Sequence, residues 1–306
     1  MRILVVGAGA VGGYFGGRLL EKGEDVTFLV RDGRRRQLKE NGLVIESVYG
    51  NVSLDPKTIV AGEEAEHFDV ILFSTKAYHL EKAIEDIRPY VSDGTIILPL
   101  LNGILHIDKL VNQFGEDKVI GGLCFIETTL DYEGKVIQTS PIHDLVFGER
   151  SSEKTERILE LEKVFSGTKA NFRLSDNINR DMWHKYLFIS TMSGITTLFR
   201  SPIGPIREQE SGQETIKHLS DELVDIMNRM EAPISQNIAS VQIKQMDGLG
   251  FTMKSSMQRD MEKLQPVEAD HLHGYLLKIA RQYQIAAPVL EAIYANLKLY
   301  EGQLVN

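Results

Sequence analysis

Short apolar runs alternate with amphipathic patterns through the first half of the chain. Apolar runs bounded by turn residues are typical of buried strands, and spacing by three and four residues is typical of helices. Strands are predicted at Ile3–Val6, Val26–Val30, Val70–Ser74, Thr95–Leu98, Lys118–Phe125, Val136–Thr139 and Asp144–Gly148. Helix faces are predicted at Leu80, Ala83, Ile84 and Ile87, at Ile107, Leu110, Val111 and Phe114, and at Ile158, Leu161 and Phe165. The alternation predicts an α/β domain with a doubly wound, mostly parallel sheet.

After about residue 175 the pattern contains helices only. The apolar stripes are Ile216, Leu219, Leu223, Ile226, Met227 and Met230, then Leu272, Tyr275, Leu276 and Ile279, then Val289, Ile293, Leu297 and Tyr300. Pro288 suits the first turn of the last of these helices. A second, all-α domain is therefore predicted at 171–306, opened by a helix from about Ile178 to Leu198 and preceded by the α/β domain at 1–170.

Glycines follow the first predicted strand at the spacing G-x-G-x-x-G. Gly7 permits a tight turn, Gly9 lets a pyrophosphate approach the backbone, and Gly12 lets the following helix pack close to the strand. Ala10 and Val11 lie where the helix begins, and a helix start offers unpaired N–H groups to a phosphate. A ligand-free glycine turn is the alternative. The position between a strand and a helix favours a dinucleotide cradle and a Rossmann-like fold.

The residue after the second strand bears on which nucleotide binds. An acidic residue at this place holds the ribose 2′-OH of NAD, whereas an arginine accommodates the 2′-phosphate of NADP. Arg31 occupies it here, and Arg34–Arg36 add positive charge. Asp32 leaves open a contact with the ribose hydroxyls, and a solvated loop is the other alternative for the arginines. The pattern favours NADPH.

Composition narrows the class of protein. The 306 residues are 42% hydrophobic and 25% charged, as in ordinary globular proteins, and allow two domains. A formal charge of −9 argues against nucleic acid or an anionic membrane as the main partner. The single Cys124 forms no internal disulfide, which predicts a reducing cytoplasm. We expect no signal peptide and no membrane span.

Two polar residues lie at predicted strand ends. Lys76 follows the strand that ends at Ser74, and Asn102 follows the next strand in the segment L-L-N-G. A solvated helix start for Lys76 and a turn or helix cap for Asn102 are the alternatives. Ligands bind at the carboxyl ends of strands in this architecture, so the shared position favours a functional role.

A lysine interrupts an aromatic-rich helix in the segment D-M-W-H-K-Y. Spacing by four places Lys185, Ile189 and Ser193 on one face of that helix. Burying an ammonium group is costly unless it meets a partner, and Glu268 in P-V-E-A-D is the candidate. A lysine tuned by burial and a carboxylate is suited to act as a general acid beside a carbonyl.

Metal chemistry has no sequence signature here. His271 and His273 lack the spacing of a helical metal pair and are expected to be surface or cap residues. The chain contains no Cys/His cluster, H-E-x-x-H or Ser-His-Asp pattern. We expect a reaction that needs no metal.

Several short motifs occur in a specific order. They are G-A-G-A-V-G at Gly7–Gly12, Arg31, T-K-A around Lys76, N-G at Asn102, W-H-K around Lys185, Ser255-Ser256 followed by Glu268, and Q-I-A-A-P ending at Pro288. In this order they resemble the ketopantoate reductase (2-dehydropantoate 2-reductase) family over nearly the whole chain. The resemblance implies a Rossmann-like domain, a helical substrate and dimerisation domain, an active site between them and a possible homodimer.

The resemblance also implies roles. NADPH would lie over Gly7–Gly12 with its 2′-phosphate at Arg31, and Lys76 and Asn102 would hold the nicotinamide side and the substrate. Lys185 would protonate the ketone oxygen during hydride transfer, and Glu268 would orient the lysine or a substrate hydroxyl.

The substrate contacts differ from the family pattern. Ser256 would bind the substrate carboxylate, and the product would be pantoate, a precursor of pantothenate. The family usually carries asparagines where this chain has Ile189 and Ser193, and some members carry a further asparagine where this chain has Ile203. Each lost hydrogen bond in a desolvated site costs about 1–3 kcal/mol. A more apolar 2-oxo acid is therefore an alternative substrate, and a non-catalytic NADP(H)-sensing protein is the alternative from another class.

Overall fold

The computed structural model describes residues 1–304 and contains two compact units. The first comprises Met1–Leu101 and His106–Asn179, and the second comprises Asn102–Leu105 and the chain from Arg180 onward. The predicted boundary at residue 170 precedes the observed one, because the strand Asn171–Leu174 pairs with Asp144–Phe147 of the first unit. Within 1–304, no helix combines the length and hydropathy that a membrane span requires.

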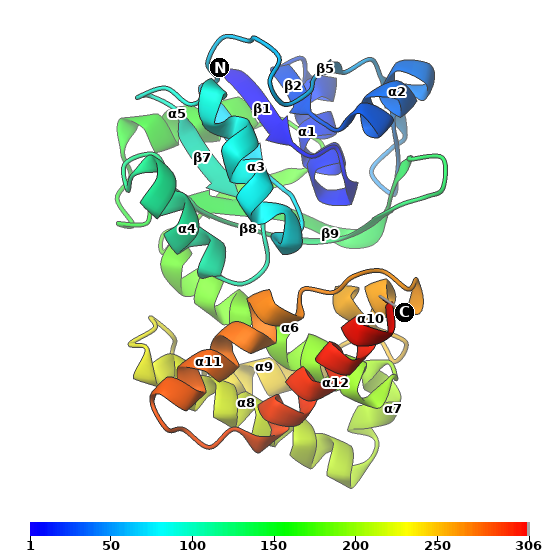
Figure 1. Ribbon diagram of the computed structural model, residues 1–306, viewed down its shortest axis with the longest axis vertical. Helices are drawn as coiled ribbons and strands as arrows, with labels where there is room; N and C mark the ends of the chain where they lie inside the picture. The colour runs from blue at the N-terminus through cyan, green and yellow to red at the C-terminus, as the bar shows by residue number, and fades with distance from the viewer. Residues whose placement is uncertain (305–306) are drawn as a thin grey trace. The chain divides into compact units, whose positions relative to one another are not determined.

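A five-stranded parallel sheet forms the centre of the first unit (Figure 1). Its order is β5-β2-β1-β6-β7, with β1 at Arg2–Val6, β2 at Asp25–Leu29, β5 at Lys57–Ile59, β6 at Val70–Phe73 and β7 at Ile96–Pro99. Ile3 lies opposite both Val26 and Val70, which makes β1 the middle strand. Strands buried on both faces are expected to be continuously apolar, as β1, β6 and β7 are.

Helices cover the two faces of this sheet. They are α1 (Ala10–Lys22), α2 (Asp32–Asn41), α3 (Leu80–Ile87) and α4 (Leu105–Phe114), with short turns η1 (Ala77–His79) and η2 (Arg88–Tyr90). Helix α5 (Glu156–Phe165) packs instead against the strand Asn171–Leu174, with Phe165 beside Phe172. Alternate residues of β1 enter different cores: Ile3 and Val5 pack with α1, whereas Leu4 and Val6 pack with α3. The four predicted apolar residues of α3 are all buried. The predicted Rossmann-like arrangement is confirmed.

The later predicted strands form a second sheet instead of extending the first. Its order is β10-β9-β3-β4, with β8 on β9, and its strands are β3 (Leu43–Ser47), β4 (Val52–Leu54), β8 (Gly121–Leu130), β9 (Val136–Gly148) and β10 (Asn171–Leu174). The predicted strands at 136–139 and 144–148 are the two ends of β9. A tight turn in which Gly134 donates to the Asp131 carbonyl joins β8 and β9. A hairpin makes its two strands antiparallel, so the expected continuation of a parallel series was wrong here.

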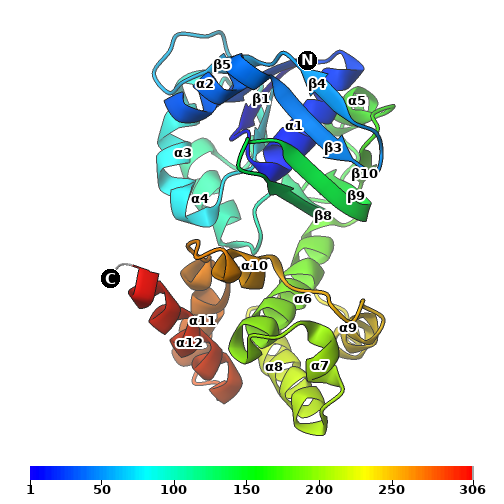
Figure 2. The same ribbon diagram turned by 90° about the vertical axis from the view of Figure 1, so that its right-hand side faces the viewer.

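Paired glycines let α1 lie between the two sheets (Figure 2). A Cβ atom on Gly16 would lie 2.7 Å from Val5 of the first sheet, and one on Gly17 would lie 2.5 Å from Ile45 of the second. Side chains at these positions would push the helix off one sheet or the other. The glycines of α1 therefore serve packing as well as ligand approach.

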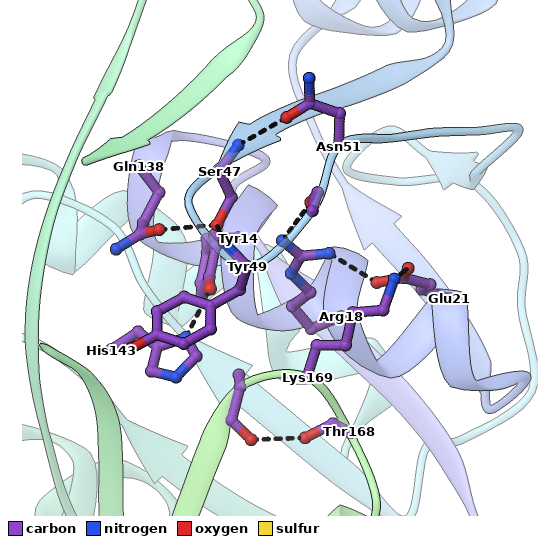
Figure 3. A network of polar contacts seen from close by, with 12 residues as sticks. Tyr14, Arg18, Glu21, Ser47, Tyr49, Asn51, Gln138, His143, Thr168 and Lys169 are labelled. Carbon is purple, nitrogen blue, oxygen red and sulfur yellow. Dashed lines mark hydrogen bonds and ion pairs between the residues drawn. The ribbon is translucent and has the colours of Figure 1, made fainter. Parts of the chain in front are cut away.

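A buried polar network fixes α1 to the loop after β3 (Figure 3). The Arg18 side chain is fully buried and donates to Glu21 Oε2 at 2.6 Å and to the Gly50 carbonyl at 2.8 Å. Tyr14 Oη and His143 Nδ1 are 2.7 Å apart, and the Tyr49 ring stacks on His143. Charge-assisted bonds of this kind hold the helix that carries the glycine loop.

The described part of the second unit contains helices and no strand, as predicted. They are α6 (Ile178–Phe199), α7 (Ile203–Arg207), α8 (Glu210–Arg229), α9 (Ile238–Asp247), α10 (Ser256–Glu262), α11 (Tyr275–Gln282) and α12 (Pro288–Leu304), with a π-helical turn η3 (Asp270–Gly274). Pro288 begins α12, as expected. The Glu222 carboxylate of α8 accepts from the N–H groups of Val289 and Leu290, which satisfies the start of α12.

Both histidines of η3 are buried, so the expectation of surface or cap residues was wrong. His271 is 8% exposed and His273 is fully buried. His273 Nε2 donates to the Ser190 carbonyl of α6 at 2.9 Å, a partner that compensates for burial of the ring. Burial lowers the pKa of His273 to about 4, because the charged imidazolium loses its hydration.

We expect His273 to make the protein less stable in mild acid. The unfolded state binds a proton near the ordinary histidine pKa, whereas the folded state does so only near about 4. The free energy of unfolding should therefore fall by up to about 3 kcal/mol as the pH drops from 7 to 4. Chemical denaturation at several pH values measures this, and His273→Gln should flatten the dependence. The exposed His218→Gln serves as the control, and an unchanged slope in His273→Gln would contradict the assignment.

Candidate active site

The glycine loop has the backbone conformation that its residues predict. Gly7 has φ of +92°, in the region that favours glycine, and its N–H donates to the Leu29 carbonyl at 3.0 Å. Gly9 is extended and caps α1, which has no acidic residue in its first turn. A Cβ on Gly9 would meet nothing within 4 Å. The loop thus leaves open space beside a helix start, which fits an anionic phosphate group.

Gly12 is the most tightly enclosed residue of the loop. A Cβ there would overlap with the Gly7 carbonyl oxygen and with Ser74 Oγ. Ser74, at the end of β6, donates to the carbonyls of Val6 at 2.9 Å and Gly7 at 3.2 Å. Sequence reasoning assigned no role to Ser74, although a polar residue ending an apolar strand was a visible signal. Its hydroxyl ties the end of β6 to the start of the glycine loop.

The arginines after β2 divide into two kinds. Arg34 donates to the carbonyls of Ala8 at 2.9 Å and Gly134 at 2.8 Å, and burial lowers its pKa. Arg35 forms an ion pair with Glu63. These two side chains support the fold. Arg31, the N-cap of α2, and Arg36 are exposed, so their guanidinium groups can meet a phosphate.

Three predicted cofactor contacts share one edge of the parallel sheet. Gly7–Gly12 follows β1, Arg31 follows β2, and Lys76 follows β6 as the N-cap of η1. Since β2, β1 and β6 are adjacent and parallel, their carboxyl ends lie together. Burial lowers the pKa of His79, and the positive charge of Arg31 lowers it further. The interaction places Arg31 near the η1 turn.

The predicted face of α6 combines one charged and two non-charged residues. Lys185 is only 6% exposed. Ile189 is half-buried and packs against the core of the second unit. Ser193 is 3% exposed, and its hydroxyl donates to the Ile189 carbonyl one turn earlier. The third departure from the family pattern, Ile203, is fully buried in the same core.

The two adjacent serines differ in environment. Ser256 is exposed and is the first residue of α10. Ser255 is buried, accepts from the Gln258 N–H at 3.1 Å and lies 2.7 Å from Thr196 Oγ1. The hydroxyl of Ser255 therefore caps α10 and ties it to α6.

The remaining predicted residues also belong to the second unit. Glu268 is half-buried and precedes η3 by two residues. The Asn102 carbonyl is 2.8 Å from His271 Nε2. The second unit thus contains Lys185, Glu268, Asn102 and Ser256, and the first contains the glycine loop, Arg31 and Lys76. Among residues 1–304, no three histidine, cysteine, aspartate or glutamate residues are grouped so that they could hold a metal ion.

Similarity to solved structures extends over the whole chain. A 2-dehydropantoate 2-reductase from Geobacter metallireducens GS-15 is 28% identical with a TM-score of 0.88, covering 98% of this chain and 99% of its own. A D-mandelate dehydrogenase solved with NADH and anilino(oxo)acetate is 22% identical with a TM-score of 0.89 and full coverage of both chains. At that identity it supports the fold alone.

Sequence comparison identifies the family. An uncharacterized oxidoreductase, YkpB, from Bacillus subtilis (strain 168) is 49% identical over 303 residues, covering 99% of this chain and 100% of its own. Residues 3–152 match the family described as ketopantoate reductase PanE/ApbA, and residues 177–301 match its C-terminal domain. The chain therefore belongs to the ketopantoate reductase PanE/ApbA family of oxidoreductases.

Proposed function

We propose that this protein is an NADPH-dependent reductase of a 2-oxo acid, with Lys185 as the general acid. The observation that carries the proposal is the burial of Lys185, 6% exposed, on a helix of the family's C-terminal domain. A buried ammonium group loses hydration, which favours release of its proton to a substrate. The family is one of oxidoreductases that reduce a keto acid, which supports the reaction type.

Each residue has a defined task in this reaction. A nucleotide held by the glycine loop would provide the hydride that reduces the carbonyl carbon of the acid. Lys185 Nζ donates a proton to the carbonyl oxygen, so that the ketone becomes a hydroxyl group, and regains a proton from solvent. Glu268 orients the lysine or a substrate hydroxyl. Ser256 binds the substrate carboxylate, and Asn102 contacts both substrate and nucleotide.

The nucleotide would be held mainly by the first unit. Gly7, Gly9, Ala10, Val11 and Gly12 offer their backbone to the pyrophosphate, with open space beside Gly9. Arg31 binds the 2′-phosphate, and Lys76 approaches the nicotinamide side. The exposure of Arg31 at the end of β2 supports NADPH over NADH.

Removal of the Arg31 side chain should weaken the binding of NADPH and leave the binding of NADH unchanged. A charge-assisted hydrogen bond contributes about 1.5–3 kcal/mol, so Arg31→Ala should raise the Kd for NADPH by about 10- to 100-fold. Fluorescence titration with each nucleotide measures the effect, and Arg173→Ala, which removes an exposed arginine from β10 of the same unit, is the control. An equal loss for both nucleotides would show that Arg31 does not read the 2′-phosphate.

Two classes of 2-oxo acid are candidates for the substrate. The family supports 2-dehydropantoate, which ends in a hydroxymethyl group. The α6 face favours a more apolar acid, because Ile189 has no polar group and Ser193 uses its hydroxyl proton on the Ile189 carbonyl. A site that lacks hydrogen-bond partners for a substrate hydroxyl discriminates poorly in its favour.

Steady-state oxidation of NADPH with 2-dehydropantoate and with 2-oxoisovalerate separates the two classes. A higher kcat/KM for 2-dehydropantoate supports pantoate formation and a place in pantothenate biosynthesis. A higher kcat/KM for 2-oxoisovalerate supports the apolar class. Tight NADPH binding without turnover of any 2-oxo acid would contradict both substrate assignments and support a nucleotide-sensing protein. A homodimer and a cytoplasmic location stay predictions.

A further inference from the structure

The turn η3 is an unusual element at a central place in the second unit. It is a π-helical turn at Asp270–Gly274, two residues after Glu268, and it leads directly into α11. Single π-helical turns are rare and occur frequently at functional sites, because the wider turn re-aims its side chains. Nothing in the proposed reaction so far uses this turn.

The start of η3 is anchored to α12. Asp270 accepts from Tyr294 Oη at 2.6 Å and from Lys298 Nζ at 3.2 Å. Burial alone would raise the pKa of the Asp270 carboxyl, but the bonds from Tyr294 and Lys298 and the charge of Lys298 together lower it. The position of the turn is therefore fixed at its first residue.

Two hydrogen bonds tie the same turn to α6. Tyr186, adjacent to Lys185, donates its fully buried hydroxyl to the Leu272 carbonyl at 2.6 Å. His273 donates to the Ser190 carbonyl at 2.9 Å. Helix α6 is thus held against η3 at Tyr186, the residue after Lys185, and at Ser190, in the next turn of the helix.

A third bond extends the connection to Asn102. His271 Nε2 lies 2.8 Å from the Asn102 carbonyl oxygen, and since a carbonyl only accepts, the ring nitrogen donates. Gly103 has φ of +77°, and a Cβ there would lie 3.4 Å from His271 Nε2 and 3.1 Å from the Leu272 side chain. The ring of His271 therefore packs directly against the Asn102–Gly103 backbone.

We propose that η3 sets the position of Asn102 relative to Lys185, and that His271 is the positioning residue. The inference rests on the proposed function, in which Lys185 donates the proton and Asn102 contacts substrate and nucleotide. His271 touches neither reactant: it holds the backbone that carries the Asn102 amide. Misplacement of a contact group by about 1 Å can cost about 100-fold in rate, so such a residue has a kinetic effect.

Substitution of His271 by glutamine and by asparagine tests this positioning role. The glutamine Nε2 reaches about as far as the histidine Nε2, whereas the asparagine Nδ2 falls short of the Asn102 carbonyl. His271→Asn should lower kcat about 10- to 100-fold, as loss of supporting contacts does elsewhere. His271→Gln should stay within about threefold of the wild type in the same assay. The exposed His218→Asn on α8 is the control. Wild-type kcat in a folded His271→Asn would overturn the proposal, as would equal losses in the Asn and Gln variants.

An NMR measurement tests the contact without turnover. The sequence contains two Asn–Gly pairs, Asn41–Gly42 and Asn102–Gly103. Labelling asparagine carbonyls with ¹³C and glycine amides with ¹⁵N gives one signal for each pair. His271→Asn should shift the Gly103 signal and leave Gly42 unchanged, and His271→Gln should restore it. An unmoved Gly103 signal overturns the positioning role. Absence of turnover in the wild type, with the Gly103 shift present, would refute the proposed function and leave the His271 contact supported.

Discussion

Replacement of Lys185 with methionine should lower kcat for 2-oxo acid reduction by at least about 100-fold, because a positioned general acid contributes about 10²- to 10⁴-fold. Methionine suits the test because its unbranched side chain resembles the lysine stem. At 6% exposure the site accepts an apolar replacement without loss of a solvated charge. The nucleotide Kd should change little, since the glycine loop and Arg31 belong to the other unit.

The control for this variant is Lys217→Met, which removes an exposed lysine from α8 of the same unit. It should retain wild-type kcat. Lys185→Arg adds a second comparison, because a guanidinium keeps the positive charge and is a far poorer proton donor. Thermal unfolding of each variant separates a catalytic loss from a folding defect. A folded Lys185→Met enzyme with unchanged kcat would remove Lys185 from the mechanism.

Local signals in the sequence predicted much of the fold. The apolar spacing of Leu80–Ile87 and of the helix from Pro288 depends only on neighbouring residues, and both helices form as expected. The glycine loop is also local, since Gly7 and Gly12 act within one strand–turn–helix unit. Periodicity therefore sufficed for these elements.

Pairing between distant segments was not predictable in the same way. The strand β9 crosses a polar segment, S-P-I-H at 140–143, which interrupts the apolar pattern. The strand continues through this segment because β9 pairs with β8 on both sides of it, with Gln138 opposite Thr128 and His143 opposite Ile126. Antiparallel pairing of this kind depends on the turn at Asp131–Gly134, not on the composition of either strand.

The residues of the candidate site also divide into those with a local sequence signal and those that depend on distant partners. Lys185 was identifiable because a charged residue in an apolar helix conflicts with its surroundings. The burial of His271 and His273 could not be predicted from the sequence, because their partners are backbone carbonyls, which carry no sequence signal. These are the carbonyls of Asn102 and Ser190. Ser74 is a third case, since it acts on the carbonyls of a loop 67 and 68 residues earlier.

Two alanine substitutions in the glycine loop should separate a structural role from a binding role. In Gly12→Ala the new methyl group would overlap with the Gly7 carbonyl and Ser74 Oγ. Such overpacking costs about 1–3 kcal/mol or more, so Gly12→Ala should lower the Tm by several degrees. It should also raise the Kd for NADPH more than about tenfold, because the loop and the start of α1 must move apart.

Gly9→Ala is the matched variant, with the opposite expectation for stability. Its methyl group would meet nothing of the protein within 4 Å, and its φ of −79° is allowed for alanine. The Tm should therefore stay near the wild-type value, while the Kd for NADPH rises because the methyl group enters the space beside the helix start. Thermal unfolding and fluorescence titration of both variants provide the two readouts. If Gly9→Ala bound NADPH as tightly as the wild type, that space would not hold the pyrophosphate, and the nucleotide would have to contact the loop elsewhere.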